Sequence, residues 1–581
     1  MLKKEDFEPY MEAEDKEIPG VQPENPAQSE HFGDFIVKYM QDVENTLKLF
    51  PGSVFQKIND MFGIIYVPLE RLGELEVDGV SYNSIPKCYT CMDREAAETS
   101  GIIRLHDHPY LKLRGKDTAV AVIDTGIDYR NDIFRDAGGS RIRYLWDQTL
   151  TTLPGESRVP FGQLFTKKDL DEALLETEPV SKVPSVDTSG HGTALAGIAA
   201  GKNVPGESFT GAAPEASLII VKVKQAKQYL RNFYLYPPDA EVFQEDDIML
   251  ALSFAMKWAE EIRMPLSVCL GIGTSQGAHL GFNALSQMVD QAAGYSRVSI
   301  AVAAGNEGNT RNHCTGIFSE TEDRVVTELR IGEKEQGFTM EFWGEPPETY
   351  GISIQSPTGE ILDVSSSIGP RTQELSFIFV ETRVFVNYVF IERQTGYPLV
   401  YFRFFHPAAG IWKIITRTRN RRTGRFHMWL PVEGLISGET YFLEPSPYTT
   451  VTAPGDARNG ITATACQYRD GSLYIGAGRG YTPDGMITPH LAAPGVDVRV
   501  PLLRGGFGNS SGTSLAAAQT AGAAALLFEW AVIRGNQPFF TGSSVKYYLQ
   551  RGARREENQQ YPNPEWGYGK LDLYHTFELL T

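Results

Sequence analysis

Four apolar segments that alternate with helical patterns constrain the fold of this 581-residue chain more than any other feature. The apolar segments are 117–129, 216–224, 265–273 and 297–308, and the clearest helical patterns are 246–263 and 282–294. Strands of a parallel sheet are buried on both faces, so they read as continuous apolar runs. Their alternation with helices predicts an α/β domain with a parallel sheet and flanking helices. In such sheets, ligands bind beyond the carboxyl ends of the strands.

Two regions depart from this pattern. Residues 34–91 contain two strand-like segments and a helix-compatible segment, 42–52, which together predict a small α+β unit. Residues 316–450 contain short apolar segments divided by turn residues, with no helical pattern, and predict an inserted antiparallel β-sandwich. We therefore divide the chain into four parts, of which the second and fourth form one α/β domain: 1–91, 92–315, 316–450 and 451–581.

Composition excludes several classes of function. The net charge of -18 argues against nucleic acid as a main partner. Five cysteines, an odd number, do not suggest a disulfide framework, and the lone C-x-x-C of Cys88 and Cys91 lacks a second pair for zinc. We predict no metal and no cofactor. The first 20 residues have no apolar segment of the secretory type, and no long apolar run predicts a membrane span.

Four polar residues stand where the edge of such a sheet would gather them. Asp124 ends an apolar strand, His191 begins a helical pattern rich in small residues, Asn306 follows another strand, and Ser514 begins an Ala-rich helix. A serine hydroxyl becomes a nucleophile when an imidazole takes its proton and a carboxylate orients that imidazole. The amide of Asn306 and the backbone N–H of Ser514 would stabilise the oxyanion. A carboxylate, an imidazole, an amide and a hydroxyl at these positions predict nucleophilic attack by the serine on an acyl group.

Each residue also has a structural interpretation when it is taken alone. Asp124 and Asn306 would be turn residues, His191 would make a structural hydrogen bond, and Ser514 would be a helix N-cap. The catalytic interpretation depends on the four occurring together, in this order and with these flanking residues.

These stretches resemble the signatures of subtilisin-like serine proteases. DTGID (124–128), GHGT (190–193) and GTS (512–514) resemble the three triad signatures, in that family's order. AAGNEG (303–308) resembles its oxyanion segment, and LAAPG (491–495) its strand and turn before the serine loop. The resemblance implies a subtilisin-like fold and a serine endopeptidase acting on polypeptides. The inserted sandwich then accounts for the separation of Asn306 and Ser514.

The small N-terminal unit, the insertion and the junction CYTCMDREAAETSGI (88–102) resemble the clostridial Csp proteases of spore germination. In that group the enzyme cuts its own propeptide, which stays bound, the insertion is a jelly roll, and the substrate is a cortex-lytic zymogen. The resemblance implies that residues 1–91 are a propeptide and a retained partner, cut near Thr90, Cys91 and Met92. With no secretory segment, we expect a cytoplasmic or spore-associated protein, with lysis as a route of release.

Peptide substrates of such enzymes bind as an added β-strand. On this basis we expect two walls of small or buried residues to flank the substrate: Cys269, Leu270 and Gly271 on one side, and Ala303, Ala304 and Gly305 on the other. Glycine in such walls lets a substrate backbone approach closely. The sequence carries no prediction of oligomeric state.

Two alternatives to an active endopeptidase remain open. The bound propeptide would leave the protein inert, as a binding or signalling component of spore germination; the intact triad favours the enzyme instead. An esterase with the same triad is disfavoured because the chain lacks a G-x-S-x-G elbow.

Overall fold

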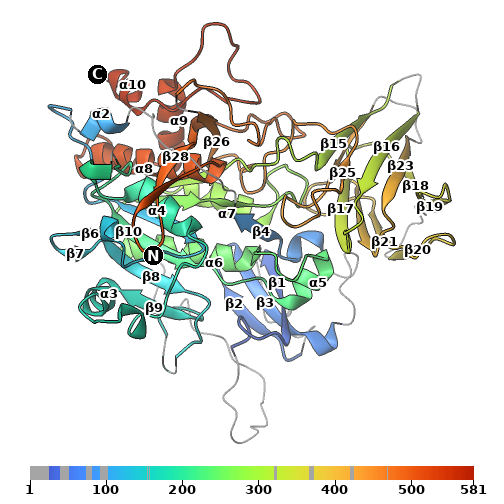
Figure 1. Cartoon of the computed structure of the whole chain (residues 1–581), viewed down its shortest axis with the longest axis horizontal. Coiled ribbons are helices and arrows are strands. Elements are labelled where there is room, and N and C mark those ends of the chain that lie inside the picture. Colours follow the sequence, from blue (N-terminus) through green and yellow to red (C-terminus); the bar gives the residue numbers. More distant parts are fainter. Residues whose placement is uncertain are drawn as a thin grey trace, which may run out of the picture.

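A central parallel sheet, a two-sheet sandwich and a small N-terminal sheet make up the protein in this computed structural model (Figure 1). The structure describes residues 25–38, 47, 51–72, 81–91, 102–106, 108–153, 155, 157–207, 209–319, 323–364, 372–418, 424–467 and 469–580. The predicted helix at 42–52 lies almost wholly outside these residues.

The central sheet has eight strands in the order β27-β26-β14-β12-β5-β10-β8-β9, and all neighbours are parallel except β8 and β9. In chain order its strands are β5 (Ala119–Asp124), β8 (Ile142–Asp147), β9 (Gln163–Thr166), β10 (Ser217–Lys222), β12 (Leu266–Leu270), β14 (Val298–Ala303), β26 (Ile461–Gln467) and β27 (Leu491–Val496). All four predicted apolar segments therefore contribute strands to one sheet.

Helices cover both faces of this sheet. Val120 and Val122 of β5 share one core with α4 (His191–Ala200) and α8 (Thr513–Phe528). Alternate residues of the same strand share the opposite core with α6 (Glu245–Glu261) and α7 (Ala284–Ala293). This two-sided burial explains why the strands are apolar throughout. The remaining helices are α2 (Ile102–His106), α3 (Lys167–Ala173), α5 (Gln228–Tyr234), α9 (Gly542–Gly552) and α10 (Leu573–Glu578).

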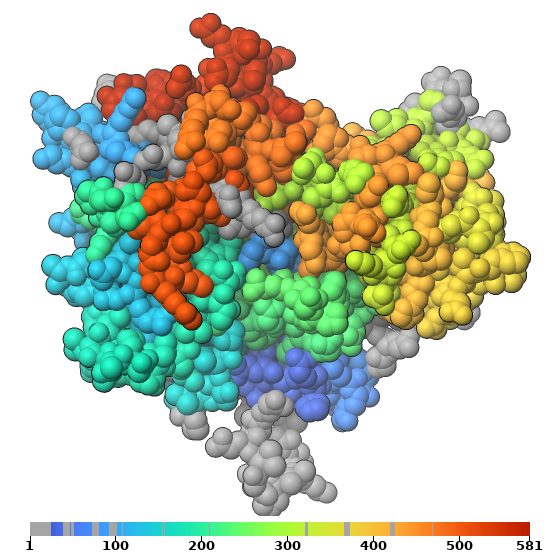
Figure 2. All heavy atoms as spheres, in the orientation of Figure 1, coloured from blue at the N-terminus to red at the C-terminus, as the bar shows by residue number. Residues whose placement is uncertain are grey.

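The inserted region forms two antiparallel sheets around a separate apolar core. One sheet has the order β15-β24-β17-β22-β21-β20 and the other β19-β18-β23-β16-β25. Their strands are β15 (His313–Ile317), β16 (Arg324–Ile331), β17 (Gly337–Gly344), β18 (Tyr350–Gln355), β19 (Ile361–Val364), β20 (Gln373–Ser376), β21 (Arg383–Val389), β22 (Leu399–Phe405), β23 (Gly410–Thr418), β24 (Arg425–Trp429) and β25 (Tyr441–Phe442). Figure 2 shows this sandwich, in yellow to orange, projecting from one side of the molecule. The predicted α/β class with an inserted antiparallel β domain is confirmed.

The N-terminal sheet contains β1 (Phe32–Lys38), β3 (Phe62–Pro68) and β2 (Val54–Lys57), in that order. Part of its apolar side chains, Ile36, Phe62, Ile64 and Tyr66, share the core of α6, whereas Phe35, Phe55, Ile65 and Val67 belong to the core that contains α4 and α8. A buried ion pair joins Asp34 of β1 to Lys227, with 2.6 Å between the carboxylate and the ammonium group. The N-terminal sheet is thus held to the central domain by both apolar packing and buried charge.

One carboxylate links all three parts of the molecule. Glu341 of β17 accepts a hydrogen bond from the hydroxyl of Tyr82, which lies in the segment that follows the N-terminal sheet. Its other oxygen accepts from the backbone N–H of Gly277, 2.9 Å away in the central domain. The sandwich therefore contacts the central domain and the N-terminal segment at the same point.

Among the described residues, one helical stretch, Thr513–Ile533, is long and apolar enough to cross a membrane by length and composition. Of its most apolar window, 83% is buried inside the protein. A buried core helix passes the same test of length and composition, and the side chains of α8 lie in the core on one face of the central sheet.

Candidate active site

Three elements bring an acid, an imidazole and a hydroxyl together at the carboxyl edge of the central sheet. β5 ends at Asp124, α4 begins at His191, and Ser514 is the second residue of α8. The helix N-cap is Gly512, so the hydroxyl of Ser514 does not serve as the cap. The exposed fractions of the three residues are 1%, 5% and 0%. The site is therefore shielded from water, with the N-terminal ends of two helices facing it.

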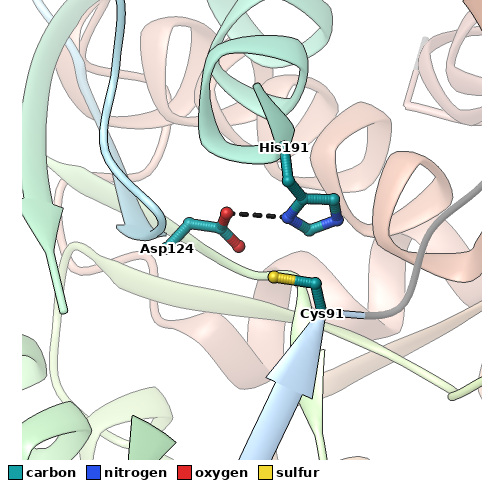
Figure 3. A group of neighbouring side chains, drawn as sticks. All are labelled: Cys91, Asp124 and His191. Carbon is teal, nitrogen blue, oxygen red and sulfur yellow. Dashed lines mark hydrogen bonds and ion pairs between the residues drawn. The ribbon is translucent and has the colours of Figure 1, made fainter. Parts of the chain in front are cut away.

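The hydrogen bonds run in the order that acyl transfer requires. Nδ1 of His191 lies 2.7 Å from Oδ1 of Asp124, and Nε2 lies 3.2 Å from Oγ of Ser514 (Figure 3 draws the first of these). The carboxylate binds the Nδ1 proton, which leaves Nε2 with the lone pair that can accept the serine proton. The arrangement can activate the hydroxyl as a nucleophile.

The electrostatics favour a protonated imidazole. Burial lowers the pKa of His191, but Asp124 and Cys91 together outweigh it, and the pKa is raised well above 6.5. A carboxylate in this position stabilises the imidazolium that forms when the serine proton is transferred.

A buried carboxylate on the loop before α4 fixes the position of His191. Oδ2 of Asp187 accepts from the N–H and the hydroxyl of Thr193, at 3.0 and 2.7 Å, and Oδ1 accepts from the hydroxyl of Thr125 at 3.0 Å. Gly192 lets the helix approach the loop after Asp124, because a Cβ there would lie 2.2 Å from the carbonyl oxygen of Gly126. Asp187 carries no separate signal in the sequence, although it stands within the same run of residues as His191.

The side chain of Asn306 is oriented by Thr513. Its Oδ1 accepts hydrogen bonds from both the backbone N–H and the hydroxyl of Thr513, each at 3.2 Å. The hydroxyl of Thr513 in turn accepts from the N–H of Gly305 at 3.0 Å. Because Oδ1 must face these donors, the amide NH₂ of Asn306 is directed elsewhere and can donate to a developing oxyanion.

The N-terminal segment enters the site as a β-strand. β4 (Cys88–Cys91) lies between β11 (Phe243–Gln244) and β13 (Ile272–Gly273), antiparallel to both. Cys91 pairs with Ile272 and Thr90 with Gly273, while Tyr89 pairs with Phe243. Met92 lies outside the described residues. Thr90 and Cys91 are thus next to the catalytic cluster, held in the way a peptide substrate would be.

The residues expected to form the substrate walls lie in different environments. Cys269 and Leu270 are buried in β12, Ala303 is the last residue of β14, and Ala304 is buried just after it. Gly271 lies against the catalytic groups, because a Cβ there would be 3.2 Å from both Cε1 of His191 and Cβ of Ser514.

Thr452, which no sequence motif marks, lies against both Gly273 and Gly305. The hydroxyl of Thr452 would be 2.4 Å from a Cβ at Gly273 and 2.5 Å from one at Gly305. Its Oγ1 is buried without a hydrogen-bond partner among the described residues. No local pattern marks this residue, since it comes from a loop beyond the inserted sandwich.

Comparison with known proteins found a matching family model and similar solved structures. The family model described as "Subtilase family" matches residues 115–327 and 443–569, which leaves out the N-terminal sheet and most of the sandwich. A solved structure titled "Structure of the Clostridium Perfringens CspB protease" is 32% identical, with a TM-score of 0.73, covering 83% of this chain and 96% of that chain. A second, titled "S41 Psychrophilic Protease", is 17% identical with a TM-score of 0.41, covering 82% of this chain and 99% of that chain. No curated protein matched the chain.

The family match includes the segments that supply the acid, the imidazole, the amide and the hydroxyl, and the similarity to the CspB protease extends over most of the chain. The chain therefore belongs to the subtilase family and is a subtilisin-like serine endopeptidase.

Proposed function

We propose that this endopeptidase cuts its own N-terminal segment, retains it, and then activates a zymogen by limited proteolysis. The observation that carries the proposal is β4, which lies as the middle strand of a three-stranded sheet and brings Cys91 to the catalytic cluster. A substrate strand held in this way presents its peptide bonds to the nucleophile.

In this mechanism Ser514 attacks the scissile carbonyl while His191 takes the hydroxyl proton. Asp124 holds the tautomer of His191 and stabilises the imidazolium. The amide of Asn306 and the N–H of Ser514 stabilise the oxyanion. His191 then protonates the leaving amine, and a water molecule activated by the same imidazole releases the acyl group.

The register of β4 favours a cut on the C-terminal side of Cys91 rather than between Thr90 and Cys91. Cys91 pairs with Ile272, one position beyond Gly271. Gly271 is the residue of this wall that contacts Ser514. Because β4 and β13 are antiparallel, the chain must continue beyond Cys91 before it lies beside Gly271 and the hydroxyl of Ser514. We propose that the cut falls at the bond between Cys91 and Met92.

The contacts of the tail support its retention after the cut. Lys87, Cys88 and Tyr89 are fully buried. The carboxylate of Glu245 accepts from the N–H of Lys87 at 3.1 Å and from the hydroxyl of Tyr89 at 3.4 Å. A cut C-terminal to Cys91 leaves all these contacts in place. We therefore propose residues 1–91 as a retained propeptide, residues 92–315 and 451–581 as the catalytic domain, and residues 316–450 as the insertion.

Mass spectrometry of the purified full chain tests the proposal. We expect two fragments separated C-terminal to Cys91 in the natural protein and one intact chain in Ser514→Ala. Ser511→Ala is the matched control, because this neighbouring hydroxyl accepts a bond from the N–H of Asp497 and not from the triad. An intact natural chain, or fragments in Ser514→Ala, would contradict self-cutting.

The second candidate is an inert binding or signalling component, and the occupied cleft favours it. β4 takes the position between β11 and β13 that a polypeptide substrate needs. A fluorophosphonate probe distinguishes the two: labelling of Ser514 in the processed protein supports the enzyme, and its absence supports the inert component.

The cysteines support an intracellular or spore-associated location. Free thiols are found at all five positions, four of them buried. Unpaired cysteines are typical of reducing compartments. We propose that the protein acts in the cytoplasm or the spore, and fractionation with an antibody against the full chain tests this.

A further inference from the structure

One group of potential metal ligands stands out among the described residues. Cys91, Asp124 and His191 each place a ligand atom within 4.8 Å of the other two. Figure 3 shows the thiol of Cys91 at the end of β4, turned toward the carboxylate and the ring. The three groups supply a sulfur, an oxygen and a nitrogen, which are the ligand types of zinc sites.

A second observation points to a ligand at this place. Oδ1 of Asp124 accepts from His191 and from the N–H of Thr125 at 2.8 Å. Its Oδ2 is buried without a hydrogen-bond partner among the described residues, although Asp124 is 1% exposed. Burying an unpaired carboxylate oxygen costs free energy, and a bound cation would remove that cost.

We propose that the propeptide tail and the catalytic residues together form a binding site for a zinc-type divalent cation that switches the enzyme off. The ligands are the sulfur of Cys91, a carboxylate oxygen of Asp124 and one ring nitrogen of His191. Tetrahedral zinc, with bonds of about 2.0 to 2.3 Å, separates its ligand atoms by roughly 3.5 Å. The three ligand atoms lie within 4.8 Å of one another, so the side chains must adjust around the ion, and the 2.7 Å hydrogen bond between Nδ1 and Oδ1 must open if both of those atoms bind it. The fourth position is left for water.

Binding removes the base that the reaction needs. A neutral imidazole has one lone pair. If the metal binds Nδ1, the ring proton moves to Nε2, which then cannot accept the proton of Ser514. If the metal binds Nε2, it uses that lone pair directly. Either way, Ser514 loses its base.

Metal binding releases the thiol proton of Cys91 and, because the site favours a protonated imidazole, the ring proton on the nitrogen of His191 that binds. Burial raises the pKa of the Cys91 thiol to about 12, so the group is protonated before the metal arrives. The metal forms a bond to sulfur, and the thiol proton passes to solvent. Since Cys91 belongs to the proposed propeptide, the metal binds the tail-occupied form and strengthens retention of the tail.

Cadmium ion tests the site on the full-length protein, because a cadmium–thiolate bond gives an ultraviolet charge-transfer band. We expect a band whose intensity corresponds to one bound cadmium ion per chain in the natural protein and in Ser514→Ala, and no band in Cys91→Ser. Cys88→Ser is the matched control and keeps the band. The other four cysteines are at most 4% exposed, so they do not compete.

Zinc ion and a chelator test the consequence. Zinc should prevent fluorophosphonate labelling of Ser514 in the natural protein, and the chelator should restore it. Cys91→Ser should be labelled with or without zinc. A missing cadmium band, or one that persists in Cys91→Ser, overturns the proposal, even if the enzyme hydrolyses peptides. A chain that binds cadmium but never reacts with the probe contradicts the enzymatic function while leaving the metal site standing.

Discussion

Nε2 of His191 lies 3.2 Å from Oγ of Ser514 across a sequence separation of 323 residues. The contact is possible because α4 and α8, which carry the two residues, share one core on the same face of the central sheet. The sandwich that separates them in sequence forms its own core beside the sheet. The insertion therefore does not alter the catalytic geometry, which depends on the packing of α4 and α8.

Gly271→Ala should lower kcat about 10²-fold, because displacements of about 1 Å in a catalytic site have effects of this size. The added Cβ would lie 2.4 Å from Cδ1 of Leu195 and 3.2 Å from both His191 and Ser514. Steady-state kinetics on a peptide substrate measures the loss. Gly206→Ala is the control, because a Cβ there meets nothing within 4 Å. Equal kinetics in the two variants would show that Gly271 does not contact the working site.

Asn306→Ala should lower kcat by about 10²–10³ with little change in KM, because an oxyanion donor acts in the transition state. Kinetics with the same peptide gives the two constants separately. A rise in KM with an unchanged kcat would show that Asn306 binds the substrate and does not stabilise the oxyanion.

Thr513→Val should lower kcat about five- to tenfold, since a lost neutral hydrogen bond is worth about 1 kcal/mol. The variant keeps the backbone N–H that donates to Asn306 but loses the hydroxyl bonds to Asn306 and Gly305. Thr513→Ser retains the hydroxyl and should restore the rate. A serine variant as slow as the valine variant would refute this positioning role.

The rate should increase with pH through a midpoint well above 6.5. His191 must be neutral to accept the serine proton, and Asp124 and Cys91 together outweigh burial in raising its pKa. The pH profile of kcat/KM on the processed enzyme measures the midpoint. Asp124→Asn should shift the midpoint to lower pH and reduce kcat about 10⁴-fold. A midpoint at or below 6.5 in the natural enzyme would contradict the assignment.

Lys227→Met should lower the free energy of unfolding by about 3–5 kcal/mol, because it leaves the Asp34 carboxylate buried without its partner. The measurement is denaturant unfolding in the Ser514→Ala background, which keeps the chain uncut. Lys182→Met is the control, since its ion pair with Glu172 is on the surface and should contribute little. Asp34→Asn combined with Lys227→Met should recover part of the loss.

Local patterns predicted the parts of the fold that depend on local physics. The strands β5, β10, β12 and β14 were visible because each is buried on both faces. The positions of Asp124 and His191, at a strand end and a helix start, followed from the same reasoning. The motifs supplied the order of the catalytic residues.

Contacts between distant segments were not predictable in this way. The residues around Phe243 give no indication that it pairs with Tyr89. The residues around Thr452 likewise do not indicate that it lies against Gly273 and Gly305. The nearness of Cys91 to Asp124 and His191 also depends on the register of β4, which only the folded sheet fixes. Tertiary packing, rather than composition, decides these positions.

The order of the catalytic elements along the chain has a consequence for biosynthesis. The strand β4, the acid and the imidazole all emerge from the ribosome before the sandwich, whereas α8 with Ser514 emerges after it. A growing polypeptide therefore carries no nucleophile during most of its translation. Translation therefore completes β4, the central strands up to β14 and the sandwich before it supplies this hydroxyl.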